Sequence, residues 1–131
     1  MVLDASVLIA HFDAEDVHHR RAAALLLATP EEPLHASQVT LAEVLVGPAR
    51  AGRLQEALAA VADLAVLGVD LAHGCPARLA TLRAESGLKL PDCCVLLAAE
   101  EVGGTIATFD PRLAAAARSR GLRVLEHETY A

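Results

Sequence analysis

Short apolar runs alternate with longer segments of helical periodicity along this chain, and this alternation constrains the fold more than any other feature of the sequence. The predicted strands are residues 2–5, 34–36, 66–69, 105–108 and 123–125. The predicted helices are residues 6–12, 17–28, 39–46, 52–65, 76–87, 91–103 and 111–120. Because short strands that alternate with helices form parallel sheets covered on both faces, the sequence predicts an α/β fold. The length indicates a single domain over residues 1–131.

Proline and glycine mark most of the predicted helix ends. Proline lacks the amide hydrogen that continues a helix, and glycine readily adopts the left-handed conformation that closes one. We therefore expect helices to end at Thr29-Pro30, Gly47-Pro48, Gly87, Gly103 and Gly121.

Composition excludes several classes of protein. The net charge of −6 argues against a protein that coats nucleic acid with a broad basic surface. No apolar run reaches the ~18 residues that span a bilayer, and the opening MVLDASVL lacks the basic region of a signal peptide. We therefore expect a cytoplasmic protein with no membrane contact. Its three cysteines, which show no CxxC spacing, are predicted to be reduced and packed.

Four carboxylates stand as the only formal charges in apolar segments. Asp4 lies in MVLDASVLIAHF, Glu43 in PLHASQVTLAEVLVGPA, Asp92 in LPDCCVLLAA and Asp110 in VGGTIATFDP. A buried, unpaired carboxylate costs several kcal/mol, and three of the four have no Lys or Arg beside them. We therefore expect the four to converge on a cation. For oxygen ligands without His or Cys nearby, that cation is Mg²⁺ or Mn²⁺.

Three of these acids also have a purely structural interpretation. Thr40-x-x-Glu43 fits a capping box, Asp110 fits the N-cap of a helix that begins with proline, and Asp92 lies in a first helical turn, where the helix dipole favours an anion. Asp4 has no such interpretation, because it ends a predicted central strand. Taken together, a shared site explains all four acids, whereas separate caps leave Asp4 unexplained.

The topology also favours a shared site. In open parallel sheets, ligands bind beyond the carboxyl ends of the strands, where the strand order reverses. Asp4 lies at the carboxyl end of the first predicted strand, and Asp110 lies just past the carboxyl end of the predicted strand 105–108. Ser6 and Thr108 are the nearest hydroxyls, with local capping as their alternative role. For Arg112, the cation nearest to this site in the sequence, we expect a solvated side chain or a pairing with Asp110.

An acidic site of this kind holds one or two divalent ions, which orient a phosphodiester and activate a water for in-line attack. The histidines form no competing site: His18 and His19 are adjacent and are expected at the surface. GxGxxG, Walker-type and GxSxG motifs are absent from the sequence, so nucleotide-fold enzymes and α/β-hydrolases lack their usual signatures.

Three segments, VLDASVLIA, SQVTLAEVLVG and KLPDCCVLLAAEEVGGTIATFD, resemble in order the motifs of PIN-domain ribonucleases, and most closely the compact VapC-type toxins. The resemblance implies a three-layer α/β/α fold with a short parallel central sheet. It also implies a Mg²⁺- or Mn²⁺-dependent endoribonuclease that acts on RNA, forms a homodimer and binds an antitoxin. By motif, Asp4, Glu43, Asp92 and Asp110 are its catalytic and metal-binding acids, and Ser6 and Thr108 its polar support.

The sequence departs from that family at one point. Many relatives carry another acidic or amide residue shortly after the fourth acid, where this chain has Arg112 and Leu113. The choice between one and two metal ions therefore stays open.

Three other function classes are alternatives. A haloacid-dehalogenase-like phosphotransfer enzyme would use Asp4, Ser37 and Lys89, but its usual second acid is replaced by Ser6. A response-regulator receiver would need paired acids after the first strand, which are missing. A non-catalytic binding module on the same fold is the third alternative.

Overall fold

The computed structural model describes residues 1–28 and 30–125. Its five strands are β1 (Val2–Leu3), β2 (Leu34–Ser37), β3 (Val66–Val69), β4 (Ile106–Ala107) and β5 (Val124–Leu125). They form one sheet in the order β3-β2-β1-β4-β5, and every neighbouring pair is parallel. In the register, Val2 lies opposite His35 of β2 and Ile106 of β4. The predicted parallel α/β sheet is confirmed.

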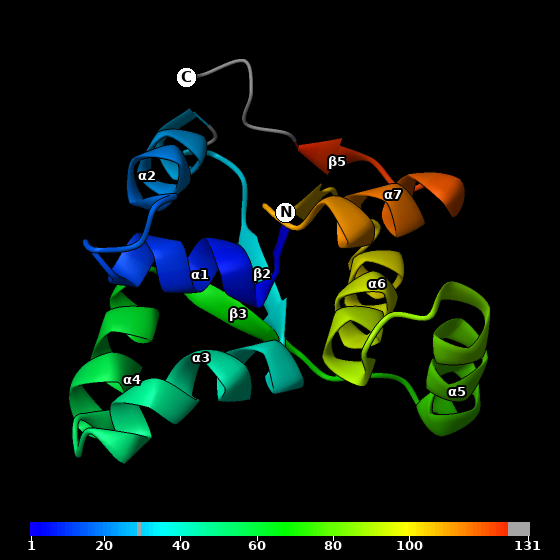
Figure 1. The fold of residues 1–131 in the computed structure, drawn as a ribbon, viewed down its shortest axis with the longest axis horizontal. Coiled ribbons are helices and arrows are strands. Elements are labelled where there is room, and N and C mark those ends of the chain that lie inside the picture. The colour runs from blue at the N-terminus through cyan, green and yellow to red at the C-terminus, as the bar shows by residue number, and fades with distance from the viewer. Residues whose placement is uncertain (29, 126–131) are drawn as a thin grey trace.

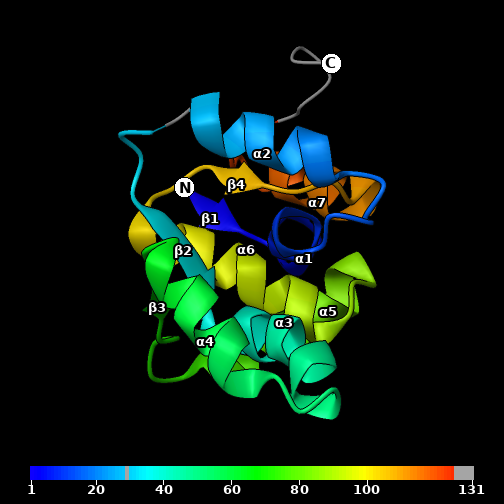
Figure 2. The same ribbon diagram turned by 90° about the vertical axis from the view of Figure 1, so that its left-hand side faces the viewer.

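Helices cover both faces of this sheet. They are α1 (Ala5–Phe12), α2 (His19–Ala28), α3 (Gln38–Arg50), α4 (Leu54–Asp63), α5 (Cys75–Ser86), α6 (Leu90–Val102) and α7 (Pro111–Ser119). Figure 1 shows α1 to α4 on one side of the sheet and α5 to α7 on the other, and Figure 2 shows the same layers after a quarter turn. The expected three-layer α/β/α fold is therefore confirmed.

The two faces of the sheet have separate hydrophobic cores, because alternate residues of a strand point to opposite faces. Val2 and Ile106 pack with buried residues of α6 and α7. Leu3 and Ala107 pack with buried residues of α1 and α2. The central strands β1 and β4 are thus buried on both faces, which leaves only their ends for polar chemistry.

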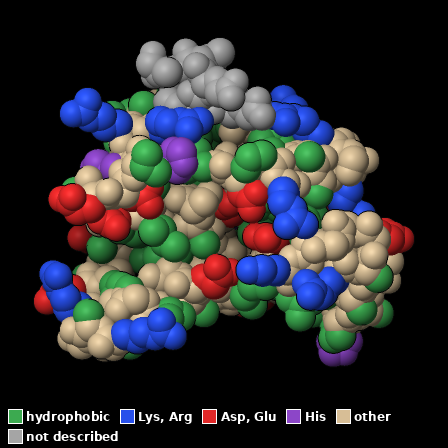
Figure 3. Space-filling view, viewed as in Figure 1, with side chains coloured by type: hydrophobic (Ala, Val, Ile, Leu, Met, Phe, Trp, Pro, Cys, Tyr) green, Lys and Arg blue, Asp and Glu red, His purple; other side chains and the backbone are tan. Residues whose placement is uncertain are grey.

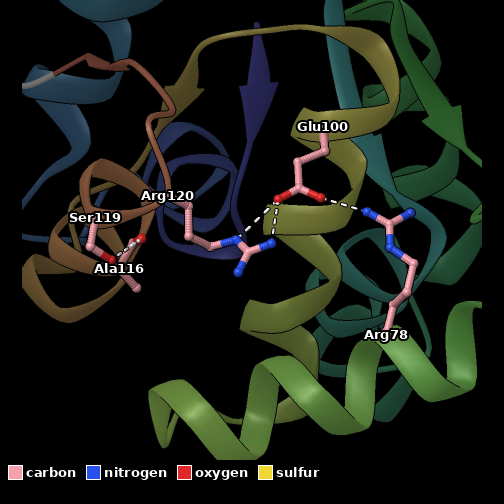
Figure 4. Close-up of polar contacts among 5 residues, drawn as sticks. All are labelled: Arg78, Glu100, Ala116, Ser119 and Arg120. Carbon is pink, nitrogen blue, oxygen red and sulfur yellow. Dashed lines mark hydrogen bonds and ion pairs between the residues drawn. The ribbon is translucent and has the colours of Figure 1, made fainter.

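An ion-pair network joins the three helices on the α6 side (Figure 4). The Glu100 carboxylate of α6 accepts from Arg78 of α5, at 2.5 Å, and from Arg120 at the end of α7, at 2.8 and 3.0 Å. Because the network is partly exposed, each of its ion pairs contributes little to the stability of the protein, on the order of 0–1 kcal/mol.

Several element boundaries differ from the sequence-based prediction. The first strand ends at Leu3 instead of residue 5, because Asp4 already caps α1. The helix predicted to stop at Gly47-Pro48 continues to Arg50, with Pro48 inside its last turn. The Ala51 amide donates to the Gly47 carbonyl at 3.1 Å, so this turn closes despite the donor that proline lacks. The expected helix end at Thr29, like residues 126–131, lies outside the described residues.

The helix ends at two glycines and the packing of the cysteines agree with the prediction. Gly87 and Gly103 cap α5 and α6 in the left-handed conformation, as predicted. Cys93 and Cys94 are buried, Cys75 is half-buried, and all are free thiols. Within residues 1–28 and 30–125, no helix is long and apolar enough to cross a membrane.

The strand order reverses between β1 and β4, and in open α/β sheets such a reversal marks the ligand site beyond the carboxyl ends of the strands. Asp4 directly follows β1, Thr108 directly follows β4, and Ser37 ends β2 at the same edge. The fold therefore brings these polar residues to one edge of the sheet.

Ser37 also caps α3. Its fully buried Oγ accepts from the Thr40 amide at 3.0 Å and lies 2.9 Å from Thr40 Oγ1. We expect Ser37→Ala to lower the free energy of unfolding by about 1–2 kcal/mol in urea denaturation, because the cap is lost in a buried place. Ser119→Ala, which removes an exposed hydroxyl near the end of α7, is the control and should change stability by less than about 0.5 kcal/mol. Equal effects of the two variants would contradict the capping role.

Candidate functional site

Asp4 joins the first strand to the first helix. Only 4% of the residue is exposed. Its Oδ1 accepts from the Val7 amide at 3.1 Å and from Ser6 Oγ at 2.7 Å, and its backbone amide donates to the Ala107 carbonyl at 3.2 Å. Asp4 is therefore the N-cap of α1. The interpretation that Asp4 has no local structural role is wrong, since the strand ends one residue before it.

Two hydroxyls tie the Asp4 carboxylate to the loop between β4 and α7. Thr108 Oγ1 donates to Asp4 Oδ2 and accepts from the Asp110 amide at 3.0 Å. Ser6 Oγ donates to Asp4 Oδ1 and accepts from the Phe109 amide at 3.1 Å. Each hydroxyl thus uses its one proton on the carboxylate and its lone pairs on the loop. The structure places Ser6 and Thr108 beside Asp4, and both also carry the local hydrogen bonds of their alternative interpretation.

The other three acids lie on the helices that begin around this edge. Asp110 is the N-cap of α7 and accepts from the Arg112 amide at 2.9 Å, and Asp92 lies in the first turn of α6, as the sequence predicts for both. Glu43 lies on α3. Because Ser37 is the cap of that helix, the capping-box interpretation of Thr40 and Glu43 is wrong. Glu43 therefore makes no cap.

The carboxylates interact electrostatically. Burial raises the pKa of Asp4 above its ordinary value, and the Asp92 charge raises it further, while hydrogen bonds from Ser6 and Thr108 oppose the shift. Partial burial also raises the pKa of Glu43, with the charges of Asp92 and Asp4 acting in the same direction. The pKa of Asp92 is raised by burial and then by the charge of Asp110. All four acids are therefore linked by mutual repulsion.

Figure 3 shows acidic side chains around a hollow in the middle of this face, with basic side chains next to them. In the part of the chain that the structure describes, however, no group of three or more His, Cys, Asp or Glu side chains is arranged to hold a metal ion. The acids are neighbours, and their function as metal ligands stays a prediction.

Two cations lie near the acids without pairing to them. Lys89, the N-cap residue of α6, acts on the charges of Glu43 and Asp92, and Arg112 of α7 acts on Asp92. Both residues are exposed. The expected pairing of Arg112 with Asp110 is not formed by the side chain, since only the Arg112 backbone amide bonds to that acid. The alternative expectation, a solvated Arg112, agrees with its exposure.

A second group of residues at this edge was not found from the sequence. The Phe109 ring lies 4.9 Å from the His18 ring, and the Arg21 guanidinium lies 5.0 Å above it. Arg21 Nη1 is 3.1 Å from His18 Nδ1, so the guanidinium donates to that nitrogen. The neighbouring His19 Nδ1 is 2.7 Å from the Ala10 carbonyl. The two histidines, which are expected at the surface, are half-buried, and each has a defined partner that the sequence does not indicate.

The acidic edge is separate from a groove of about 440 Å³ elsewhere in the molecule. That groove lies between the end of α1, the second half of α3 and α4, and its lining includes Phe12, Val44, Pro48 and Val61. None of the four acids lines it, so its mainly apolar walls give no information about the chemistry of the carboxylates.

Comparisons with known proteins agree with the fold. The sequence model of the PIN domain family matches residues 1–119. A chain of a toxin–antitoxin complex from Klebsiella pneumoniae has a TM-score of 0.75 at 24% identity, over 96% of each chain. FitAcB from Neisseria gonorrhoeae gives 0.71 at 22% identity, also over 96% of each chain.

VapC20 from Mycobacterium tuberculosis, described as a toxin that cleaves the sarcin-ricin loop, has a TM-score of 0.63 at 19% identity. The match covers 88% of the present chain and 93% of VapC20. Among curated proteins, none matches the sequence.

The two hydroxyl bridges generate a prediction for Thr108. We expect Thr108→Val to lower the free energy of unfolding by about 1–3 kcal/mol, because a buried carboxylate oxygen and the Asp110 amide both lose their partner. Thr108→Ser keeps the hydroxyl and should cost less than about 1 kcal/mol. Chemical denaturation followed by circular dichroism measures both. A Val variant as stable as the Ser variant would contradict the bridge.

Mutual repulsion generates a prediction for stability against pH. Since the folded-state pKa values of Glu43 and Asp92 are raised, the stability that these groups contribute is complete below their ordinary values of 4.5 and 3.8 and is lost as the pH rises through the folded values. We therefore expect Glu43→Gln and Asp92→Asn to have a Tm equal to or above that of the wild type near neutral pH in EDTA. This advantage should disappear toward pH ~4.

Asp63→Asn, which changes an exposed acid at the end of α4, is the matched control for both variants and should leave the pH dependence of the Tm unchanged. Loss of stability near neutral pH in either site variant would contradict the repulsion and favour a structural role for that acid.

Proposed function

The chain belongs to the PIN domain family, and on this premise we propose that it is a metal-dependent endoribonuclease and the toxin of a toxin–antitoxin pair. The observation that carries the proposal is the arrangement of Asp4, whose buried carboxylate is fixed by Ser6 and Thr108 at the strand-order reversal and interacts with Asp92 and Glu43. Asp110 completes the acid set through its interaction with Asp92.

The chemistry of these donors fits a hard divalent cation. All four are carboxylates, the ligands that Mg²⁺ and Mn²⁺ prefer, and their repulsion is of the kind that a dication relieves. Asp4, Glu43, Asp92 and Asp110 would together hold one or two such ions. A bound ion would polarise the phosphodiester and lower the pKa of the attacking water.

The side chains themselves have distinct tasks in this proposal. Ser6 and Thr108 are positioning residues, which hold the Asp4 carboxylate in one orientation by donating to both of its oxygens. Glu43 and Asp92 are carboxylates next to the buried Asp4, and in this proposal one of their oxygens accepts the proton that the attacking water loses. The reaction then breaks one P–O bond of RNA, and the leaving oxygen takes up a proton.

An antitoxin partner and a homodimer belong to the same proposal. A toxin–antitoxin complex among the similar structures supports the first, whereas the second rests on the likeness to VapC-type toxins alone. The phosphotransfer alternative is disfavoured by Ser37, whose fully buried hydroxyl is committed to Thr40 and the cap of α3.

We expect the purified protein to cleave RNA with Mg²⁺ or Mn²⁺, EDTA to stop the cleavage, and Asp4→Asn to reduce the rate by about 100-fold or more. Asparagine keeps an oxygen for the Val7 amide but lacks the negative charge, so the variant should remain folded. Cleavage of a labelled RNA on a denaturing gel measures the rate, with Asp63→Asn as the control of equal charge change. Full activity of Asp4→Asn would refute the proposed site, and a folded wild type without metal-dependent cleavage would favour a binding module.

A further inference from the structure

Lys89 and Arg112 lie at the starts of two helices that carry acids of the site. Lys89 is the N-cap residue of α6, three residues before Asp92, and Arg112 lies in the first turn of α7, two residues after Asp110. Lys89 also acts electrostatically on Glu43 and Asp92, and Arg112 on Asp92. Both side chains are exposed, and in residues 1–28 and 30–125 neither forms a side-chain hydrogen bond or an ion pair. Figure 3 shows basic side chains beside the acids on this face.

Several arginines away from the acids have side-chain partners. Arg53 pairs with Glu56, while Arg78 and Arg120 pair with Glu100. Arg21 is engaged with His18 and Phe109. Lys89 is, in addition, the only lysine of the sequence. Lys89 and Arg112 thus stand out as cations next to the acids whose charged ends have no partner among the described residues.

The place of Lys89 and Arg112 next to the acids affects how closely RNA phosphates can approach. A set of four carboxylates on a chain of net charge −6 repels a polyanion, and this repulsion is strongest next to the acids themselves. A divalent ion bound by the acids would offset part of this charge, and cations next to the acids would offset more of it for the phosphates that flank the cleaved bond. Exposed Lys and Arg side chains without partners are the groups that make such contacts.

We propose that Lys89 and Arg112 bind the RNA phosphates on the two sides of the cleaved phosphodiester and so align the strand across the acids. This inference rests on the proposed nuclease function and adds the residues that hold the substrate. Phosphate contacts carry no base specificity, so the pair positions the strand and leaves sequence preference to other parts of the molecule.

A simpler role for the two cations is to offset the charge of the acids in the folded protein. The two roles differ in what they predict. An offsetting cation stabilises the metal-free protein, whereas a phosphate-binding cation changes RNA affinity and its salt dependence.

The test measures binding of a fluorescein-labelled single-stranded RNA of mixed sequence in Mg²⁺ over a series of KCl concentrations, on the Asp4→Asn background so that the RNA stays intact. We expect Lys89→Gln and Arg112→Gln each to weaken binding and to lower the slope of log K against log[KCl] by about 0.7, and the double variant by about 1.4. Lys89→Arg should retain the affinity, since it keeps the charge.

Arg123→Gln is the matched control, because Arg123 precedes β5 at the amino edge of the sheet, opposite the acids, and is exposed. In the active protein, the two site variants should raise KM and leave kcat within about 2-fold, as expected for lost ground-state contacts.

Two outcomes overturn the inference. The first is salt slopes equal to that of the Arg123 control, in a protein that binds and cleaves RNA; the nuclease function then stands and the phosphate contacts do not. The second is an unchanged slope together with a lower Tm of Lys89→Gln in EDTA, which assigns the cations to charge compensation. Absence of RNA cleavage by the wild type would instead refute the proposed function, and this inference with it.

Discussion

The hydrogen-bonded carboxylate of Asp4 is the interaction on which the rest of the site depends. It meets the end of β1, the first turn of α1 and the loop that follows β4, and it receives donors from Val7, Ser6 and Thr108. Burying a carboxylate is unfavourable unless such donors surround it. The same hydroxyls orient the Asp110 and Phe109 amides, so the position of the fourth acid follows from the first.

The acids around Asp4 oppose the folding that brings them together. Burial and mutual repulsion raise the pKa values of Asp4, Glu43 and Asp92, which means that their charged forms are less favourable in the folded protein than in the unfolded chain. Burial of apolar side chains in the two cores, one on each face of the sheet, offsets this unfavourable contribution to the free energy of folding. A functional site that lowers stability is common in enzymes, and it agrees with the catalytic role proposed for these residues.

The sequence predicts those parts of the molecule that depend on local patterns. The alternation of strands and helices, the cap at Asp110 and the nearness of Ser6 and Thr108 to Asp4 follow from residues close to strand ends. It does not predict contacts away from the strand ends, such as the His18 and Arg21 side chains against Phe109, because no topological rule brings these residues together. Pro48 is a different case. Gly47-Pro48 predicts the end of a helix, but α3 continues to Arg50 because the amides after Pro48 still form helical hydrogen bonds, such as that from Ala51 to the Gly47 carbonyl.

The shortness of the central strand has a consequence for how the acids are held. Strand β1 has two residues, and the backbone amide of Asp4 is its last rung toward β4. The residue that bears the carboxylate therefore pairs through its backbone with one central strand and directly follows the other, both of which are buried on both faces. The loop from Thr108 to Asp110 is tied to the same carboxylate, so the first and fourth acids are held by the packed centre of the sheet instead of by a surface loop alone.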